Sequence, residues 1–241
     1  MPYVRFGDGE TAVVAISGGD AFVRRFEPAS AVRHARRIAT LFPATCRVYV
    51  LGYAAEGDVV ELVADFIRTH AAQAIVAGVS FGGLIALRVA ASVPHAVRGL
   101  VLLSGGPRFS DEGRARIAEQ IATLERGDLP AMAAPFATLF RRPWLNAIAR
   151  CSLWLRRRSL ASRMNDPEFI IRMLQMALTI EITTLPRCPT SILIGERDQF
   201  FDVGAARAFG DVVCLPRETH MVAIENAEAV REAIQSIAPQ T

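Results

Sequence analysis

Short runs of apolar residues alternate with longer amphipathic segments along most of the chain. The runs predict strands at residues 11–16, 47–51, 74–78, 99–103, 191–194 and 212–215. Because these runs are almost continuously apolar, we expect strands buried on both faces, as in a mainly parallel sheet flanked by helices. The segment YVRF near the start is a candidate for one earlier strand.

Polar residues that can cap free backbone N–H groups mark the starts of helices between these strands. Asp58 precedes an apolar periodic segment and is followed three positions later by Glu61, a spacing similar to a capping box. Asn226 opens the helical pattern AEAVREAIQSI near the end of the chain. Alternating strands and helices predict the α/β class.

The alternation is interrupted between residues 107 and 186, where only helical patterns occur. The signals predict helices that open at Ser110 and Asp111, that cover residues 132–140 and 143–158, and that open at Asp166 with Pro167 in the first turn. A helical insertion between parallel strands is expected at their C-terminal edge, where open α/β sheets bind ligands.

Length and composition agree with one domain that carries an insertion. The chain has 241 residues, of which 51% are hydrophobic and 21% charged, values that exclude intrinsic disorder. We divide it into an α/β core, residues 1–106 and 187–241, and a helical lid (cap), residues 107–186, inserted in that core.

No apolar run approaches the roughly 18 residues of a membrane helix, and the start lacks the features of a signal peptide, so we expect a cytoplasmic protein without a membrane span. The net charge of +3 is mildly basic and all 27 basic residues are arginine. Without clustered charge and interleaved aromatic residues, no nucleic-acid partner is expected. The four cysteines are scattered, which predicts buried free thiols and neither a zinc site nor a disulfide framework. No metal and no cofactor is expected.

The segment from Gly78 to Gly82, with the sequence GVSFG, carries the strongest chemical signal. It follows a predicted strand and precedes a helical run, which is the context that a G-x-S-x-G nucleophile requires. Ser80 would lie on a strained turn, with glycines two positions away on either side so that strand and helix can approach closely. Ser80 is the candidate nucleophile.

A serine nucleophile needs a base, and the base needs an orienting acid. Asp198 follows the predicted strand at 191–194, and Glu196 and Asp202 compete with it for the acid role. His220 follows the strand at 212–215 and is the candidate base. The remaining histidines, His34, His70 and His95, fit helix or connecting-loop positions.

On GVSFGG, on GERD with the later Asp202, and on THMVAIEN before a helix, the sequence resembles the α/β-hydrolase superfamily, in its compact lidded esterase and thioesterase branch. The resemblance covers nearly the whole chain and implies a triad of Ser80, Asp198 and His220. It also implies an oxyanion hole from the backbone N–H groups of Phe81 and Gly19. The family usually has His-Gly where this chain has Ser17 and Gly18.

These residues predict a hydrolase that cleaves a carboxylic ester or thioester through an acyl-enzyme on Ser80. Two alternatives stay open on the same fold: a carbon–carbon lyase or hydrolase that uses the same triad, and a receptor that binds a ligand without hydrolysis.

The predicted lid provides the only information on substrate and partners. Phe136, Phe140, Trp144 and Trp154 are candidates for contact with a small acyl substrate. The lid also carries the arginines Arg141, Arg142, Arg150, Arg156, Arg157, Arg158 and Arg163. They are either a solvated helix face or a docking surface for an acyl carrier protein or coenzyme A.

Overall fold

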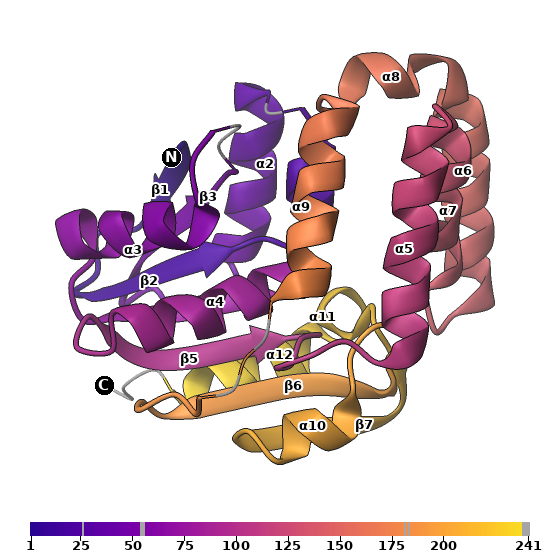
Figure 1. Cartoon of the computed structure of the whole chain (residues 1–241). Helices are drawn as coiled ribbons and strands as arrows, with labels where there is room; N and C mark the ends of the chain where they lie inside the picture. The colour runs from indigo at the N-terminus through magenta and orange to yellow at the C-terminus, as the bar shows by residue number, and fades with distance from the viewer. Residues whose placement is uncertain (26, 54–55, 181, 183, 238–241) are drawn as a thin grey trace.

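A single seven-stranded sheet forms the centre of the molecule (Figure 1). The structure is a computed structural model that describes residues 1–25, 27–53, 56–180, 182 and 184–237. The strand order is β1-β3-β2-β4-β5-β6-β7, and β1 pairs antiparallel with β3 while the other neighbours are parallel. This arrangement confirms the predicted α/β class with a mainly parallel sheet.

Every predicted strand is present, and most are longer than the apolar run that predicted them. The strands are β1 (Tyr3–Phe6), β2 (Thr11–Ile16), β3 (Cys46–Leu51), β4 (Ala74–Val79), β5 (Val97–Leu103), β6 (Thr190–Arg197) and β7 (Asp211–Thr219). The polar ends of β6 and β7 extend past the apolar stretches because they pair with each other, as Arg197 does with Thr219. This pairing carries both strands up to Asp198 and His220.

Helices cover both faces of the sheet, because side chains alternate in direction along each strand. Val14 and Ile16 of β2 face a core shared with α3 (Val59–His70) and α4 (Phe81–Ser92). Val13 and Ala15 face the opposite core, which includes residues of α2 (Pro28–Ala39) and α12 (Ala227–Gln235). The two layers leave the C-terminal ends of the parallel strands as a free edge.

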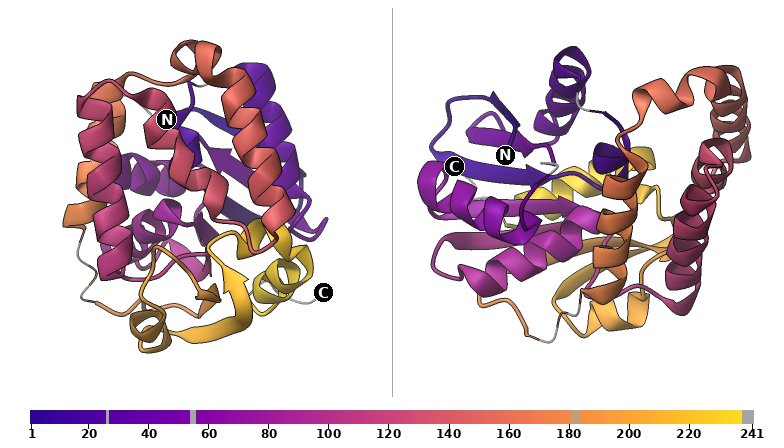
Figure 2. Two further views of the ribbon diagram at one scale, coloured as in Figure 1. Left: turned by 90° about the vertical axis from the view of Figure 1, so that its right-hand side faces the viewer. Right: turned by 45° about the horizontal axis from the view of Figure 1, so that its top comes forward.

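The chain between β5 and β6 is helical and stands beyond that edge of the sheet (Figures 1 and 2). It contains α5 (Asp111–Glu125), α6 (Leu129–Ala133), α7 (Pro143–Arg156), α8 (Leu160–Arg163) and α9 (Pro167–Thr179), with 3-10 segments at Ala134–Thr138 and Arg157–Ser159. We call residues 107–186 the insertion. Short helices that the sequence did not predict are α1 (Gly19–Val23), α8, α10 (Val203–Arg207) and α11 (Val222–Glu225).

The predicted helix caps are confirmed. Asp58 accepts hydrogen bonds from the backbone N–H groups of Val60 and Glu61, and Asn226 accepts one from that of Ala229. Ser110 caps α5 and Asp166 caps α9 in the same way. Among the described residues, no helix combines the length and the hydropathy needed to cross a bilayer.

Candidate active site

Ser80 lies on the sharp turn between β4 and α4, with φ 53° and ψ −121°. This is a strained conformation for a residue that has a Cβ atom. Two glycines make the turn feasible: a Cβ at Gly82 would overlap the carbonyl oxygen of Ile16, and one at Gly78 would overlap that of Gly82. The sequence therefore folds here so that the serine side chain lies at the strand end while strand and helix pack closely.

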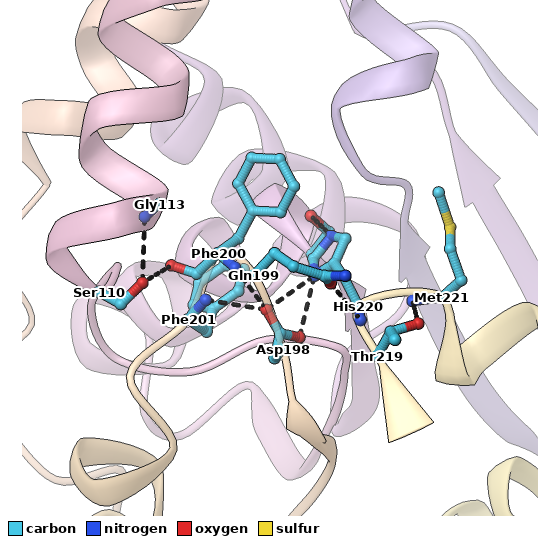
Figure 3. Close-up of polar contacts among 10 residues, drawn as sticks. Ser110, Gly113, Asp198, Gln199, Phe200, Phe201, Thr219, His220 and Met221 are labelled. Carbon is cyan, nitrogen blue, oxygen red and sulfur yellow. Dashed lines mark hydrogen bonds and ion pairs between the residues drawn. The ribbon is translucent and has the colours of Figure 1, made fainter. Parts of the chain in front are cut away.

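His220 and Asp198 come from the neighbouring strands and meet this serine. Ser80 Oγ lies 2.9 Å from His220 Nε2, and His220 Nδ1 lies 2.9 Å from Asp198 Oδ2 and 3.1 Å from Asp198 Oδ1. Figure 3 shows the carboxylate of Asp198 directed at the imidazole ring. The structure thus joins the three predicted side chains in one hydrogen-bonded chain.

The carboxylate of Asp198 is held from several sides. Its side chain has 0% exposure, and its Oδ1 accepts hydrogen bonds from the backbone N–H groups of Phe200 at 2.8 Å and Phe201 at 2.9 Å. An ionised carboxylate only accepts hydrogen bonds, so His220 Nδ1 carries the proton in this arrangement. Nε2 is then free to accept the proton of the Ser80 hydroxyl.

The two competing carboxylates have other partners. Asp202 caps α10 and forms an ion pair with Arg108, and the hydrogen bond from the backbone N–H of Ala205, with that ion pair, lowers the pKa of Asp202. Glu196 accepts a hydrogen bond from the backbone N–H of Arg217 at 3.2 Å. Only Asp198, of the three, is within hydrogen-bond distance of His220.

The loop that carries His220 is fixed by contacts that sequence patterns did not identify. The backbone N–H of His220 donates to Gln199 Oε1 at 3.0 Å, and the ring of Phe200 lies 4.7 Å from the imidazole centre. Two residues before His220, the buried carboxylate of Glu218 pairs with Arg141 of the insertion at 3.2 Å. These partners are either distant from His220 in sequence or not part of a recognisable sequence motif, so the contacts depend on the tertiary fold.

The insertion also braces the loop that carries Asp198. The hydroxyl of Ser110 donates to the carbonyl oxygen of Phe200 at 3.2 Å and accepts from the N–H of Gly113 at 3.0 Å (Figure 3). Gly113 has no room for a Cβ because the backbone of Phe200 occupies that space. The first turn of α5 therefore packs directly on the acid loop.

The predicted oxyanion donors begin two helices beside Ser80. Phe81 is the first residue of α4 and Gly19 the first of α1, and the first N–H groups of a helix have no partner within it. The rings of Phe81 and Phe22 lie 5.1 Å apart and hold the two segments together. Gly18, which the prediction had not singled out, is packed closest, since a Cβ there would lie 3.2 Å from that of Ser80.

Ser17 replaces the usual histidine before this glycine pair and has its own partners. Its hydroxyl lies 3.1 Å from His34 Nε2, and its carbonyl oxygen accepts a hydrogen bond from the Tyr53 hydroxyl at 2.5 Å. Burial raises the pKa of Tyr53, so this group stays a neutral donor. His34 was predicted as an ordinary helix position, but it contacts the loop that leads to Gly19.

A cavity of about 470 Å³ lies between the insertion and the core, next to the histidine loop. Of the four aromatic residues predicted to contact substrate, Phe136 and Phe140 line it. Trp144 and Trp154 do not, and they are 55% and 60% exposed on α7. The insertion arginines are likewise dispersed: Arg156 and Arg163 line the cavity, whereas Arg157 stacks on Trp154.

Within the described residues, no group of three His, Cys, Asp or Glu side chains is placed to hold a metal ion. The four cysteines are free thiols, of which Cys46 is buried and Cys188 and Cys214 are partly exposed. The prediction of buried thiols is wrong for Cys151, which is exposed on α7.

Comparison with known proteins agrees with this architecture. The model of the alpha/beta hydrolase family matches residues 13–233. Among solved structures, the chain is similar to MGS-M2, an alpha/beta hydrolase enzyme from a Medee basin deep-sea metagenome library, with 18% identity, a TM-score of 0.77, and coverage of 100% of this chain and 94% of that chain.

Two further solved structures have the same fold. A thermophilic esterase from Thermogutta terrifontis has 18% identity and a TM-score of 0.70, with 98% of this chain and 91% of that chain covered. The enol-lactonase from Burkholderia xenovorans LB400 has 16% identity and a TM-score of 0.72, with 98% and 95% covered. At such identities the likeness establishes the fold alone. No curated protein matches the sequence.

Proposed function

This chain belongs to the alpha/beta hydrolase family, and on that premise we propose that it is a serine hydrolase that cleaves a carboxylic ester or thioester. One observation carries the proposal: Ser80, on its strained turn, lies 2.9 Å from His220, which lies 2.9 Å from Asp198. A serine, a base and an orienting acid in this order form the arrangement that activates a hydroxyl as a nucleophile.

In the first step His220 Nε2 takes the proton of the Ser80 hydroxyl while Oγ attacks the carbonyl carbon of the substrate. The resulting oxyanion would accept hydrogen bonds from the backbone N–H groups of Phe81 and Gly19, at the starts of α4 and α1. The imidazolium then gives its proton to the leaving alcohol or thiol. This leaves an acyl group on Ser80.

In the second step water releases the acyl group. His220 deprotonates the water, which attacks the acyl carbon, and the proton returns to Ser80 Oγ when the carboxylic acid leaves. Asp198 holds the imidazole in one tautomer and stabilises its positive charge in both steps. Its burial and its two backbone hydrogen bonds keep the carboxylate in place throughout.

Esters and thioesters are favoured as substrates because the nucleophile is a serine. Members of the same fold that open epoxides or carbon–halogen bonds need an aspartate at this turn. Two of the structural neighbours are described as an esterase and an enol-lactonase, names that agree with ester cleavage.

The proposal is tested by labelling with a fluorophosphonate, followed by turnover of a panel of short-chain esters and thioesters. We expect the probe to modify Ser80, and Ser80→Ala to lose both labelling and on the order of 10⁴ or more in kcat. The folded state of Ser80→Ala is checked by circular dichroism. Labelling at another residue, or activity retained by Ser80→Ala, would refute the assignment.

The panel also separates the alternatives. A carbon–carbon lyase would release product from its own substrate class without incorporating oxygen from water, and it would leave the esters untouched. A receptor would bind ligand tightly and turn over none of the panel.

A further inference from the structure

The cavity next to the histidine loop is apolar along most of its wall. It is bounded by α1 and α2 of the core and by α6 to α8 of the insertion, and its apolar lining includes Met132, Phe136, Phe140, Leu153, Leu160 and Met164. Met221, the residue after His220, forms part of the wall. The volume of about 470 Å³ lies within the range of small-molecule sites. The cavity therefore borders the histidine loop through Met221.

Four arginines from separate parts of the chain, each exposed on one side to solvent, line this apolar space. The cavity is lined by Arg24, Arg37, Arg156 and Arg163, while Asp20 is its only acidic lining residue among those described. Asp20 is already paired, since its Oδ1 lies 2.6 Å from Arg24 Nε. Among the described residues, the side chains of Arg37, Arg156 and Arg163 form no ion pair with a carboxylate. The cavity lining therefore has a net positive charge.

We infer that this cavity binds the acyl part of the substrate and that this part carries an anionic group, a carboxylate or a phosphate. The inference rests on the proposed function and specifies its substrate class. The apolar wall next to Met221 suits the hydrocarbon portion near the scissile carbonyl. Arg37, Arg156 and Arg163 suit the anion, because the planar guanidinium group binds carboxylate and phosphate oxygens in pairs.

Matched esters test the anionic preference. The probes are p-nitrophenyl pentanoate, the mono-p-nitrophenyl ester of glutaric acid, and the p-nitrophenyl ester of 4-phosphonobutyric acid, which differ only in a terminal methyl, carboxylate or phosphonate group. We expect at least one anionic ester to have a kcat/KM about ten times that of the pentanoate or more, mainly through a lower KM. The preferred ester distinguishes a carboxylate from a phosphate.

Single substitutions then locate the site. Arg37→Gln, Arg156→Gln and Arg163→Gln should each lower the ratio of anionic to neutral kcat/KM by about tenfold. Arg150→Gln and Arg158→Gln are the controls, because both arginines are exposed on the insertion but do not line the cavity. If the control variants lower the ratio as much as the cavity variants do, the preference for anionic esters comes from general surface charge, and the inference is overturned.

A binding measurement keeps this test independent of turnover. Monomethyl glutarate and methyl pentanoate are titrated calorimetrically into Ser80→Ala and into Ser80→Ala with Arg156→Gln and Arg163→Gln. We expect only the anionic ester to bind Ser80→Ala, and its binding to be lost in the triple variant. If no ester is hydrolysed, the proposed function fails, but this titration still shows whether the cavity binds an anionic group. Equal binding of both esters to Ser80→Ala would overturn the inference of an anion-binding cavity and leave the proposed hydrolysis intact.

Discussion

The sheet edge that carries the triad and the helix α7 of the insertion hold their side chains in opposite ways. At the sheet edge, Asp198 has 0% side-chain exposure and its carboxylate contacts two backbone N–H groups and the imidazole. On α7 no residue is buried, and Leu155 is 67% exposed. At the sheet edge several contacts hold the carboxylate, whereas α7 leaves large apolar side chains such as Leu155 mostly exposed.

This difference separates two requirements of an enzyme. Proton transfer and oxyanion stabilisation need groups fixed within a fraction of an ångström, which several simultaneous contacts provide. Binding of a small molecule needs apolar surface in a concave site, and the insertion contributes such surface to the cavity through Phe136, Phe140 and Leu153. Other parts of the insertion contact the sheet edge directly, since Ser110 hydrogen-bonds to the acid loop and Arg141 pairs with Glu218 next to the histidine loop.

The largest effect is expected from breaking the fixed region at its acid. Asp198→Asn preserves the shape of the side chain but allows the wrong imidazole tautomer, so kcat should fall by about 10⁴. Steady-state kinetics on the ester that the panel selects measure the loss. Asp202→Asn and Glu196→Gln are the controls and should keep kcat within a few-fold, and α10 should keep its cap because asparagine caps a helix as well as aspartate does. An equal loss at Asp202 would transfer the acid role to that residue.

A pair of identical substitutions compares the packing of the two regions directly. Leu84 in α4, one turn after Ser80, has 0% exposure, whereas Leu155 lies on the surface of α7. Leu84→Ala should lower the free energy of unfolding by about 2–5 kcal/mol, because it removes buried apolar surface and leaves a cavity. Leu155→Ala should change it by less than about 0.5 kcal/mol. Urea unfolding curves measure both, and similar losses would mean that α7 is packed as tightly as the core.

The sequence was sufficient to predict the sheet and the three polar side chains at its edge. Local signals explain this: apolar runs such as residues 11–16 determine buried strands, and the glycines around Ser80 determine the turn. Parallel strands end at one edge, so residues after β4, β6 and β7 meet there whatever the intervening chain does.

The remaining features depend on tertiary contacts that leave no periodic pattern. Glu218 and Arg141 are separated by the whole of β6 and most of the insertion, and their ion pair arises only from the way the insertion folds back. The exposure of Trp144 and Trp154 was equally inaccessible, because aromatic residues on an amphipathic helix can face either a cavity or solvent. A helical pattern identifies a helix but not its neighbour.

Breaking the ion pair between the insertion and the histidine loop should have an intermediate effect. Arg141→Ala leaves the carboxylate of Glu218, which is 3% exposed, without its ion-pair partner, so we expect a loss of about 1–3 kcal/mol in the free energy of unfolding. Arg142→Ala, at the adjacent exposed arginine, should cost less than about 0.5 kcal/mol.

A double-mutant cycle separates this ion pair from a general effect of charge. In the Glu218→Gln background the buried charge is absent, so Arg141→Ala should cost clearly less than in the wild type. Denaturant unfolding of all four proteins gives the coupling energy. A coupling energy near zero would mean that Arg141 joins the insertion to the histidine loop only through its backbone N–H, which donates to Glu225 Oε2 at 2.8 Å.

The smallest effect is expected at His34, which supports the loop before Gly19 through Ser17. Desolvation lowers the pKa of His34 from its usual 6.5, against the opposing influence of Asp20. The unfolded chain therefore binds the proton more readily than the folded chain in the interval below pH 6.5, and stability falls as the pH decreases through that interval. His34→Gln removes this titration. Between pH 8 and pH 5 the free energy of unfolding of the wild type should therefore fall more than that of the variant. Since His34 is partly exposed, the shift should be small. A shift in the opposite direction would mean that the fold favours the protonated imidazole, with Asp20 as its dominant neighbour.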